Sequence, residues 1–475
     1  MDQNRTPLLD AVAAYARREP AYFKIPAHRF ERGISPRWRK WTGDRIFRFD
    51  LTEAEGLDDL HCAEGVIRQA QELAAELYGA RKTWFLVNGT TCGNEAMILA
   101  ACREGDKILV PRNAHKSVLM GLTLSGARPV YLMPKQQEDR GISGGITPRQ
   151  VEEGLRQHPD CRCVFLVSPT YYGVLSNIRE IARICHEHDA LLLVDEAHGA
   201  HYLPFAEPLG WRGGAVAAGA DLVVQSAHKT LPSLTQTAWL HRNGTLVDPA
   251  AVDRQLDVFE TSSPSYPLLV SLDGCTGWLR ENGPAAFAAW RARLDRFAAA
   301  ARRWHNTPVL GLGPERRDFF AFDDGKILLR IGAAGAAQLR AAGFEPEMVC
   351  GPNVLAMTSH CDDGDALDRL ADWLGERDAA APPPPRAGAL LPAPGPARCT
   401  IAEALDRPAA TMPLAEAVGK TAAEYVWAYP PGVPLVAPGE QVTDAFVEAA
   451  GALTAAGTTL HHSGGGGAGR LAVLA

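Results

Sequence analysis

Short apolar runs that alternate with helical stretches, from about residue 63 onward, constrain the fold of this chain most. The first run, residues 84–87, follows a stretch with helical apolar spacing that Gly79 ends. Similar runs lie at 108–110, 130–132, 164–167, 191–194 and 222–224. Apolar strands separated by helices are typical of a mostly parallel sheet covered by helices. We therefore predict an α/β fold with its functional side chains at the carboxyl ends of the strands.

The rest of the pattern predicts the domain organisation. We expect an N-terminal segment and major domain over 1–282, although residues 1–60 show few clear elements. A smaller α/β domain over 283–378 would begin with an Ala/Arg-rich helix near 283–304. The Pro-rich stretch 379–398 is too poor in donors to pack and predicts a linker. A C-terminal domain would cover 399–475, with residues 461–475 as a Gly-rich flexible tail.

Composition and charge exclude several classes of protein. Hydrophobic residues make up 46% of the 475 residues and charged residues 22%, as in soluble globular proteins. The net charge of −7 argues against nucleic acid as a partner, because phosphate binding needs a basic face. No uncharged apolar run approaches the ~20 residues that span a bilayer. The ten cysteines are scattered without a CxxC pair, so we expect no metal site and a cytoplasmic location.

The turn after the first apolar run, residues 88–96, consists mostly of small and hydroxyl-bearing residues and opens a helix. Such a turn lets backbone N–H groups approach an anion, and the helix N-terminus adds partial positive charge. The turn therefore predicts a phosphate site, with an ordinary tight strand–helix turn as the alternative.

Asp195 directly follows the apolar run 191–194. A carboxylate buried at the mouth of a sheet requires a cationic partner, and a protonated pyridinium nitrogen would serve. The alternative is that Asp195 caps a helix.

Lys229 stands just beyond the run 222–224, close to Ser226, His228 and Thr230. The flanking groups can bind a phosphate while the lysine amine captures an aldehyde as a Schiff base. A solvated surface lysine is the alternative. His115, after the run 108–110, could lie over an aromatic cofactor ring or be a surface histidine.

Taken together, these strand ends offer an anion-binding turn, a buried acid, a stacking imidazole and an amine. Pyridoxal 5'-phosphate (PLP) is the cofactor that needs all of them, because its protein partners are a lysine and an acid on the pyridinium nitrogen. The residues therefore predict a PLP enzyme.

Motifs along nearly the whole chain resemble those of the bacterial ornithine/lysine/arginine decarboxylases, in the short form without an extra N-terminal regulatory domain. The matching segments include FKIPAHRFERG, SPTYYGVLSNI, VDEAHGAH, SAHKTLPSLTQTA, TSSPSYPLLVSLD and YPPGVPLVAPGEQV. The resemblance implies the fold type I PLP-dependent transferase-like fold and a homodimer or higher homo-oligomer. It also implies decarboxylation of lysine, arginine or ornithine to the amine, a step of polyamine biosynthesis.

The resemblance further implies roles for single residues. Lys229 would carry the cofactor, Asp195 would pair with the pyridinium nitrogen and His115 would stack on the ring. Ala197 would pack beneath the ring, and His198 would lie near its phenolic oxygen. The phosphate ligands would be Gly89, Thr90, Thr91, Ser226 and His228.

Two further segments receive less definite roles from the resemblance. Thr261 and Ser262 would lie at the dimer interface and reach the neighbouring subunit's phosphate, unless they cap the next helix. Tyr429, Gly432 and Glu440 would shape the substrate entrance.

Two other functions stay open from the sequence. One is another PLP reaction, such as transamination or amine oxidation, and the other is a non-catalytic family member. Ala27 and Arg29 stand where the family usually has Gly and Lys, and Lys420 stands where Arg is expected, so substrate preference could differ. The sequence does not identify which basic amino acid is used.

Overall fold

The computed structural model describes residues 5–18, 23–30, 32–137, 140–313, 317–381, 391–429, 432–455, 457–467 and 469–475. The chain divides into two compact units. The first comprises Met1–Ala100 and Glu196–Ala288, and the second comprises Ala101–Asp195 and Ala289–Ala475.

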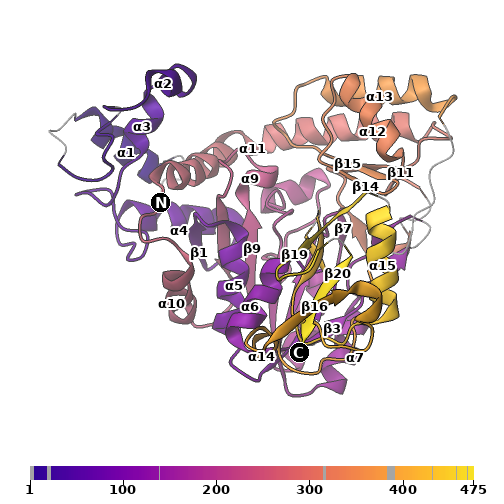
Figure 1. The fold of residues 1–475 in the computed structure, drawn as a ribbon. Helices are drawn as coiled ribbons and strands as arrows, with labels where there is room; N and C mark the ends of the chain where they lie inside the picture. The colour runs from indigo at the N-terminus through magenta and orange to yellow at the C-terminus, as the bar shows by residue number, and fades with distance from the viewer. Residues whose placement is uncertain are drawn as a thin grey trace. The chain divides into compact units, whose positions relative to one another are not determined.

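The first unit contains an antiparallel sheet in the order β9 (Leu222–Ser226), β10 (Ala238–Arg242) and β1 (Lys82–Leu86). Helix α4 (Val66–Tyr78) packs against β1 and ends at Gly79, whose φ of +70° is left-handed. Helices α5 (Gly89–Ala101) and α9 (Ala227–Thr230) follow β1 and β9 after very short turns. Figure 1 shows α4, α5 and α9 around these strands.

The N-terminal 60 residues are more regular than we predicted. They form α1 (Pro7–Arg17), α2 (Pro36–Thr42) and α3 (Arg45–Phe49). Helix α1 buries Leu8, Val12 and Ala16, a four-residue spacing that places them on one face. The expectation of few elements was wrong because each helix is short, and α2 and α3 are Arg-rich with at most one buried side chain, so they give little apolar periodicity.

The long helix predicted at 283–304 begins much earlier. Helix α10 (Pro249–Phe259) is followed by α11, which runs from Tyr266 to Ala301. Pro284 lies inside α11 rather than at its start. The predicted start was wrong because Pro is most favoured in the first turn of a helix, and here burial of Phe287 and Trp290 outweighs its cost.

The second unit contains a parallel sheet in the order β8 (Leu191–Asp195), β6 (Cys161–Val167), β2 (Lys107–Pro111) and β3 (Arg128–Leu132). Helices connect these strands along the chain: α6 (Lys116–Ser125) precedes β3, α7 (Pro148–Gln157) precedes β6 and α8 (Ile178–Glu187) precedes β8. The predicted mostly parallel sheet with covering helices is confirmed.

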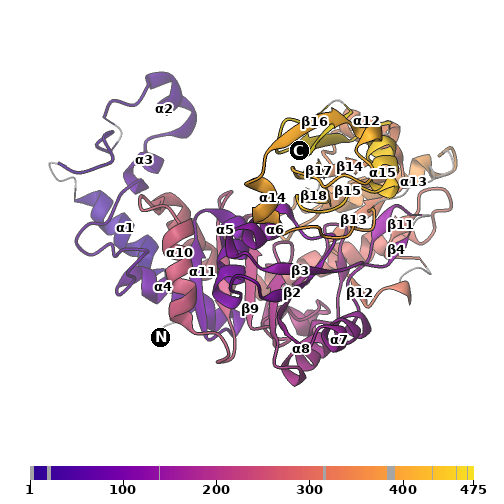
Figure 2. The same ribbon diagram turned by 60° about the horizontal axis from the view of Figure 1, so that its bottom comes forward.

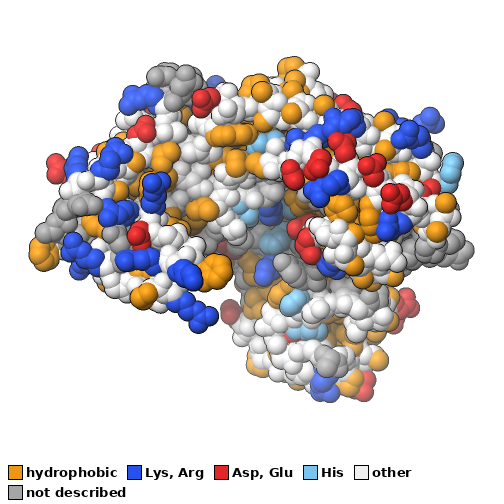
Figure 3. Space-filling view, turned by 90° about the horizontal axis from the view of Figure 1, so that it is seen from above, with side chains coloured by type: hydrophobic (Ala, Val, Ile, Leu, Met, Phe, Trp, Pro, Cys, Tyr) orange, Lys and Arg blue, Asp and Glu red, His pale blue; other side chains and the backbone are white. Residues whose placement is uncertain are grey.

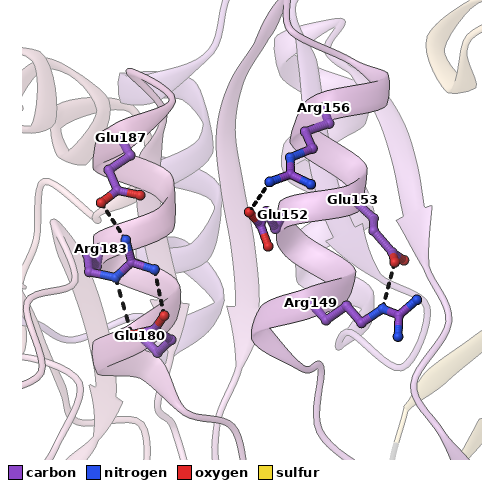
Figure 4. A network of polar contacts seen from close by, with 7 residues as sticks. All are labelled: Arg149, Glu152, Glu153, Arg156, Glu180, Arg183 and Glu187. Carbon is purple, nitrogen blue, oxygen red and sulfur yellow. Dashed lines mark hydrogen bonds and ion pairs between the residues drawn. The ribbon is translucent and has the colours of Figure 1, made fainter.

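Helices α7 and α8 present a charged face to solvent and an apolar face to the protein. Figure 4 shows Arg183 between Glu180 and Glu187 on α8, and the Arg149–Glu153 and Arg156–Glu152 pairs on α7. The opposite faces bury side chains such as those of Val151, Leu155, Ile181 and Cys185. Because the pairs are exposed, the buried faces account for most of the helix docking.

A small antiparallel sheet follows α11, with the order β11 (Val309–Leu310), β13 (Lys326–Leu329), β15 (Asn353–Met357) and β14 (Met348–Cys350). Helices α12 (Gly332–Ala341) and α13 (Ala366–Asp378) belong to the same stretch. The short elements of the chain are β4 (Gln136–Gln137), β5 (Ile142–Ser143), β7 (Val174–Leu175), β12 (Ala321–Phe322), η1 (Pro204–Leu209) and η3 (Leu414–Glu416).

The described residues of the C-terminal part form short strands and helices. Its helices are α14 (Ile401–Leu405) and α15 (Asp444–Ala455). Its strands are β16 (Ala409–Pro413), β17 (Val426–Tyr429), β18 (Val433–Val436), β19 (Thr459–His462) and β20 (Arg470–Leu474), which Figure 2 shows in part beside α15.

The prediction of a flexible tail at 461–475 was wrong. Strand β20 pairs antiparallel with β16, and Leu471, Ala472 and Val473 are at most 5% exposed. Strand β19, just before the glycines, pairs with β17. The Gly-rich composition dominated the sequence interpretation, whereas the apolar run after the glycines gains enough burial to order the chain end.

Within the described residues, no helix is long and apolar enough to cross a membrane. The same residues contain no group of three or more His, Cys, Asp or Glu side chains placed to hold a metal ion.

Candidate active site

In the first unit, the turn between β1 and α5 has the geometry of an anion site. Gly89 begins α5 with a φ of +74°, a left-handed conformation that favours glycine. A β-carbon at Gly93 would collide with Val224, so this glycine lets α5 approach β9 closely. The first N–H groups of α5, including those of Thr90 and Thr91, have no partner within the helix.

Strand β9 brings further donors to the same turn. Ser226, the last residue of β9, places its Oγ 3.2 Å from Oγ1 of Thr90. Two strand ends that are far apart in sequence therefore meet at one point. Hydroxyl groups beside a helix N-terminus match the chemistry of a phosphate group.

Lys229 lies on α9, one turn beyond Ser226. Its Nζ is 3.3 Å from Nε2 of His198, in the loop that follows Asp195. An imidazole at this distance can exchange a proton with the amine. The sequence motifs SAHKT and VDEAHGAH are thus brought together, as the prediction of one common site requires.

His228 uses one ring nitrogen for the backbone. Its Nδ1 lies 2.9 Å from the carbonyl oxygen of Thr237 and is therefore the donor. Burial lowers the pKa of His228, the carbonyl opposes this, and the charge of Lys229 lowers the pKa further. In the neutral ring Nε2 is an acceptor, so His228 can donate to a phosphate only when it is protonated.

A buried polar chain that we did not predict fixes the loop with Ala197 and His198. Glu196 accepts hydrogen bonds from Gln225 Nε2 at 2.7 Å and from the Ala215 N–H at 2.8 Å. Gln225 in turn contacts His241, whose pKa burial lowers to about 3. The signal in the sequence was a polar residue inside each of the apolar strands β9 and β10.

Thr261 and Ser262 are exposed in the segment between α10 and α11. Oγ1 of Thr261 accepts a hydrogen bond from the Ser263 N–H at 3.2 Å, and the Thr261 carbonyl lies 2.9 Å from His61 Nε2. Helix α11 begins only at Tyr266. Thr261 therefore closes its own turn, and its exposed surroundings leave the segment accessible.

In the second unit, Asp195 ends β8 and is 4% exposed. His115 follows β2 and caps α6, because its Nδ1 accepts a hydrogen bond from the Ser117 N–H at 3.2 Å. This bond leaves the proton of the neutral ring on Nε2 and limits the ring's orientation. Both residues stand near the strand ends where the sequence predicted them, Asp195 as the last residue of β8 and His115 four residues after the end of β2 at Pro111.

Glu440, expected at the substrate entrance, is buried in an ion pair with Arg112. The Arg112 guanidinium donates to both carboxylate oxygens, at 2.6 and 2.8 Å, and the two side chains are 1% and 4% exposed. Arg112 also donates to the Leu435 carbonyl at 2.9 Å. The C-terminal strands are therefore anchored to the end of β2, close in sequence to His115.

A second contact strengthens this anchor. The Lys116 N–H donates to the Gly432 carbonyl at 3.2 Å, so the residue after His115 is held by the C-terminal part of the chain. Thr123 on α6 also contacts the hydroxyl of Tyr425. The side chain of Tyr429 lies outside the described residues.

Comparisons with known proteins decide the family. Residues 6–287 match the family model "Orn/Lys/Arg decarboxylase, major domain", and residues 393–460 match its C-terminal domain. The chain belongs to the Orn/Lys/Arg decarboxylase family. It is a PLP-dependent enzyme that removes the carboxyl group of a basic amino acid.

Similar proteins cover nearly the whole chain. An arginine decarboxylase of Bacillus subtilis is 34% identical over 461 residues, which cover 94% of this chain and 92% of that protein. An arginine decarboxylase of Halalkalibacterium halodurans is also 34% identical, over 93% of this chain and 92% of its own length. The lysine decarboxylase of Francisella novicida has a similar fold, with a TM-score of 0.81 at 19% identity over 98% of this chain and 80% of that chain.

The residues of the first unit fit the cofactor of this family. A phosphate requires donors, which the start of α5, Thr90 and Ser226 supply, and an aldehyde requires an amine, which Lys229 supplies. These donors and the amine have the chemistry that PLP binding requires.

We predict that Glu440→Ala destabilises the second unit by about 3–5 kcal/mol, because it leaves the Arg112 charge buried without its partner. Urea unfolding followed by tryptophan fluorescence measures the loss. Replacing both partners with apolar residues, Arg112→Met with Glu440→Leu, should recover most of it.

A matched control is Asp365→Ala, which breaks the exposed Arg369–Asp365 pair and should change little. If Glu440→Ala is no more destabilising than this control, the buried pair does not anchor the C-terminal strands.

Proposed function

We propose that this decarboxylase acts on L-arginine in preference to lysine and ornithine, with Lys229 as the residue that carries PLP. The observation that carries the site assignment is the 3.3 Å contact between Lys229 and His198 beside the Thr90–Ser226 hydroxyl pair. Four relatives named arginine decarboxylase, 32–34% identical over 92–94% of this chain, support arginine as the substrate.

PLP, when bound, supplies an electron sink for the carbanion that decarboxylation leaves at Cα. The remaining steps belong to residues of this chain. The α5 N-terminus with Gly89, Thr90 and Thr91 would bind the phosphate, together with Ser226 and His228. These contacts would fix the position of the cofactor, and placing reacting groups in advance lowers the barrier.

Proton handling falls to Lys229 and His198. The 3.3 Å contact lets the imidazole Nε2 take a proton from the lysine ammonium, so that the amine becomes nucleophilic. Returned along the same contact, the proton is available for Cα. Ala197, a small residue next to His198, would pack beneath the cofactor ring.

Asp195 and His115 complete the assignment of roles. A carboxylate that is 4% exposed favours a cationic partner, so Asp195 would keep the pyridine nitrogen protonated. His115, with its Nδ1 engaged by Ser117, would present a ring of fixed orientation for stacking. We assign PLP binding and catalysis to both residues.

The proposal also covers the domain organisation and the cellular location of the protein. The two family matches support a major domain near 1–282 and a C-terminal domain near 399–475, separated by residues 283–378 and a linker at 379–398. We place the enzyme in the cytoplasm, in polyamine biosynthesis.

The substrate experiment separates the proposal from its rivals. Incubated separately with arginine, lysine and ornithine, the purified protein with PLP should release CO2 from arginine most efficiently and form agmatine. Higher kcat/KM for lysine or ornithine would contradict the substrate assignment. A keto acid or an aldehyde as the main product would instead indicate transamination or amine oxidation.

We also propose a homodimer, in which residues of both chains complete each site. An exposed aromatic and basic segment supports it: Phe23, Trp38 and Trp41 are 92%, 55% and 83% exposed. Residues 23–50 hold eight of the 48 Lys and Arg residues but three of the 55 Asp and Glu residues, so their charge is +5 and that of the rest is −12. Trp and Arg are enriched at protein interfaces, and a second copy supplies the opposite charge.

Figure 3 shows Lys and Arg side chains with hydrophobic ones among them on the side that carries the N-terminal helices, at the left. His61, eleven residues beyond this segment, lies 2.9 Å from the Thr261 carbonyl through its Nε2. The chain just after the basic aromatic segment therefore contacts the Thr261–Ser262 segment, which in our proposal lies at the dimer interface.

We predict that Trp38→Ser with Trp41→Ser shifts the protein from dimer towards monomer in sedimentation velocity. The control Leu246→Ser removes another exposed side chain, 60% accessible, and should leave the dimer intact.

Mixing Lys229→Ala with a Thr261→Val, Ser262→Ala variant should restore partial activity if sites are shared. A fully active wild-type monomer at assay concentration would contradict the proposal.

A further inference from the structure

Glu260 accepts hydrogen bonds from the turn that we assign to phosphate binding. This residue follows α10 and is 7% exposed. Its Oε1 accepts hydrogen bonds from the Val87 N–H at 3.1 Å and the Asn88 N–H at 3.4 Å. The thiol of Cys92 donates to the same oxygen at 3.1 Å. One carboxylate oxygen therefore contacts the turn before α5 and the first turn of α5.

The backbone next to Glu260 provides a second anchor. The side-chain amide of Asn88 donates to the Phe259 carbonyl at 2.8 Å, and the Cys92 thiol also contacts the Gly89 carbonyl at 3.1 Å. Residues 259–260 thus fix the chain on the N-terminal side of Gly89. The direction of the free N–H groups at the start of α5 depends on these contacts.

The charge of Glu260 does not suit an anion site. Its second oxygen, Oε2, is buried and has no hydrogen-bond partner among the described residues. Burial raises the pKa of Glu260, while the bonds from Cys92, Asn88 and Val87 and the charge of His61 oppose this. A phosphate at the start of α5 would add a second negative charge close to the carboxylate.

Among the other titratable groups around Glu260, His61 contributes a positive charge, which the Asp257 carboxylate beside it offsets. Burial raises the pKa of Cys92 and of Glu95 on α5, which keeps the thiol neutral. His61 is engaged with the Asp257 carboxylate at 3.0 Å and with the Thr261 carbonyl at 2.9 Å. A bound phosphate is therefore best accommodated when the carboxyl group of Glu260 carries a proton.

We propose that Glu260 is a positioning residue, which orients the phosphate-binding turn of residues 87–92 and takes up a proton when the phosphate binds. The inference rests on the proposed phosphate-binding role of this turn. It gives a supporting role to Glu260, which is not among the residues assigned to contact the cofactor. The neutral carboxyl group still accepts the backbone bonds through Oε1, so the turn keeps its geometry.

The sign of the pH dependence follows directly. A nearby anion raises the pKa of a carboxyl group, so the bound state holds more protons than the free state between the two pKa values. Affinity for the phosphate group must then fall as the pH rises through this interval. Pyridoxal, which lacks the phosphate, should show neither the proton uptake nor this loss.

The test uses the apo form of the full-length protein. Binding of PLP and of pyridoxal is titrated by absorbance from about pH 6 to about pH 9, and calorimetry in buffers of different ionisation enthalpy counts the protons taken up. The variants are Glu260→Gln, which is neutral and similar in shape, and Glu260→Ala. Glu95→Gln, which also neutralises a half-buried carboxyl group near Cys92, is the matched control.

Wild type and Glu95→Gln should take up a proton with PLP and lose affinity with rising pH by the same factor. Glu260→Gln should bind PLP at least as tightly as wild type at high pH, without that proton uptake. Glu260→Ala should lose about tenfold or more in PLP affinity, with little change for pyridoxal, since the turn loses its acceptor.

Two results would overturn the inference: proton uptake that persists in Glu260→Gln, or a Gln variant that binds PLP as weakly as Ala. If Glu260→Ala does not fold, the Gln comparison alone decides. Failure of the wild type to bind PLP would contradict the proposed function instead.

Discussion

One constraint recurs in both units: Gly89, Lys229, Asp195 and His115 each stand at or shortly after the end of an apolar strand. At the end of β1 the chain enters α5 at Gly89, and at the end of β9 it enters α9, which carries Lys229. In the second unit β8 ends at Asp195, and β2 is followed by His115, which caps α6. Apolar burial fixes the strands, so the polar groups beyond them have little freedom to move. Helix starts at two of these points leave N–H groups available for an anion or a capping imidazole.

Buried carboxylates hold this arrangement in place. Glu260 supports the turn before α5, Glu196 supports the loop with Ala197 and His198, and Glu440 anchors the C-terminal strands to Arg112. Each carboxylate accepts at least two hydrogen bonds, which offsets the cost of removing it from water. None of the three is among the residues assigned to contact the cofactor. The orientation of the reactive groups therefore depends on these three carboxylates, which hydrogen-bond to the segments that carry those groups.

The sequence was sufficient for the parts that local pattern determines. The apolar runs located the strands around Trp84 and Leu192, and the polar residues after them located Lys229 and Asp195. The sequence was insufficient where contacts between residues far apart along the chain determine the local structure. Burial of Phe287 keeps Pro284 inside α11, and pairing with β16 orders Leu471 after a Gly-rich stretch. The ion pair of Glu440 was not predicted for the same reason, because its partner Arg112 is 328 residues away along the chain.

The assignment of Lys229 is the central claim, and covalent mapping tests it most directly. The protein loaded with PLP is reduced with borohydride, digested and analysed by mass spectrometry. The account predicts a pyridoxyl group on the peptide that contains Lys229, and no such peptide from Lys229→Ala. A pyridoxyl group on any other lysine as the main product would contradict the account.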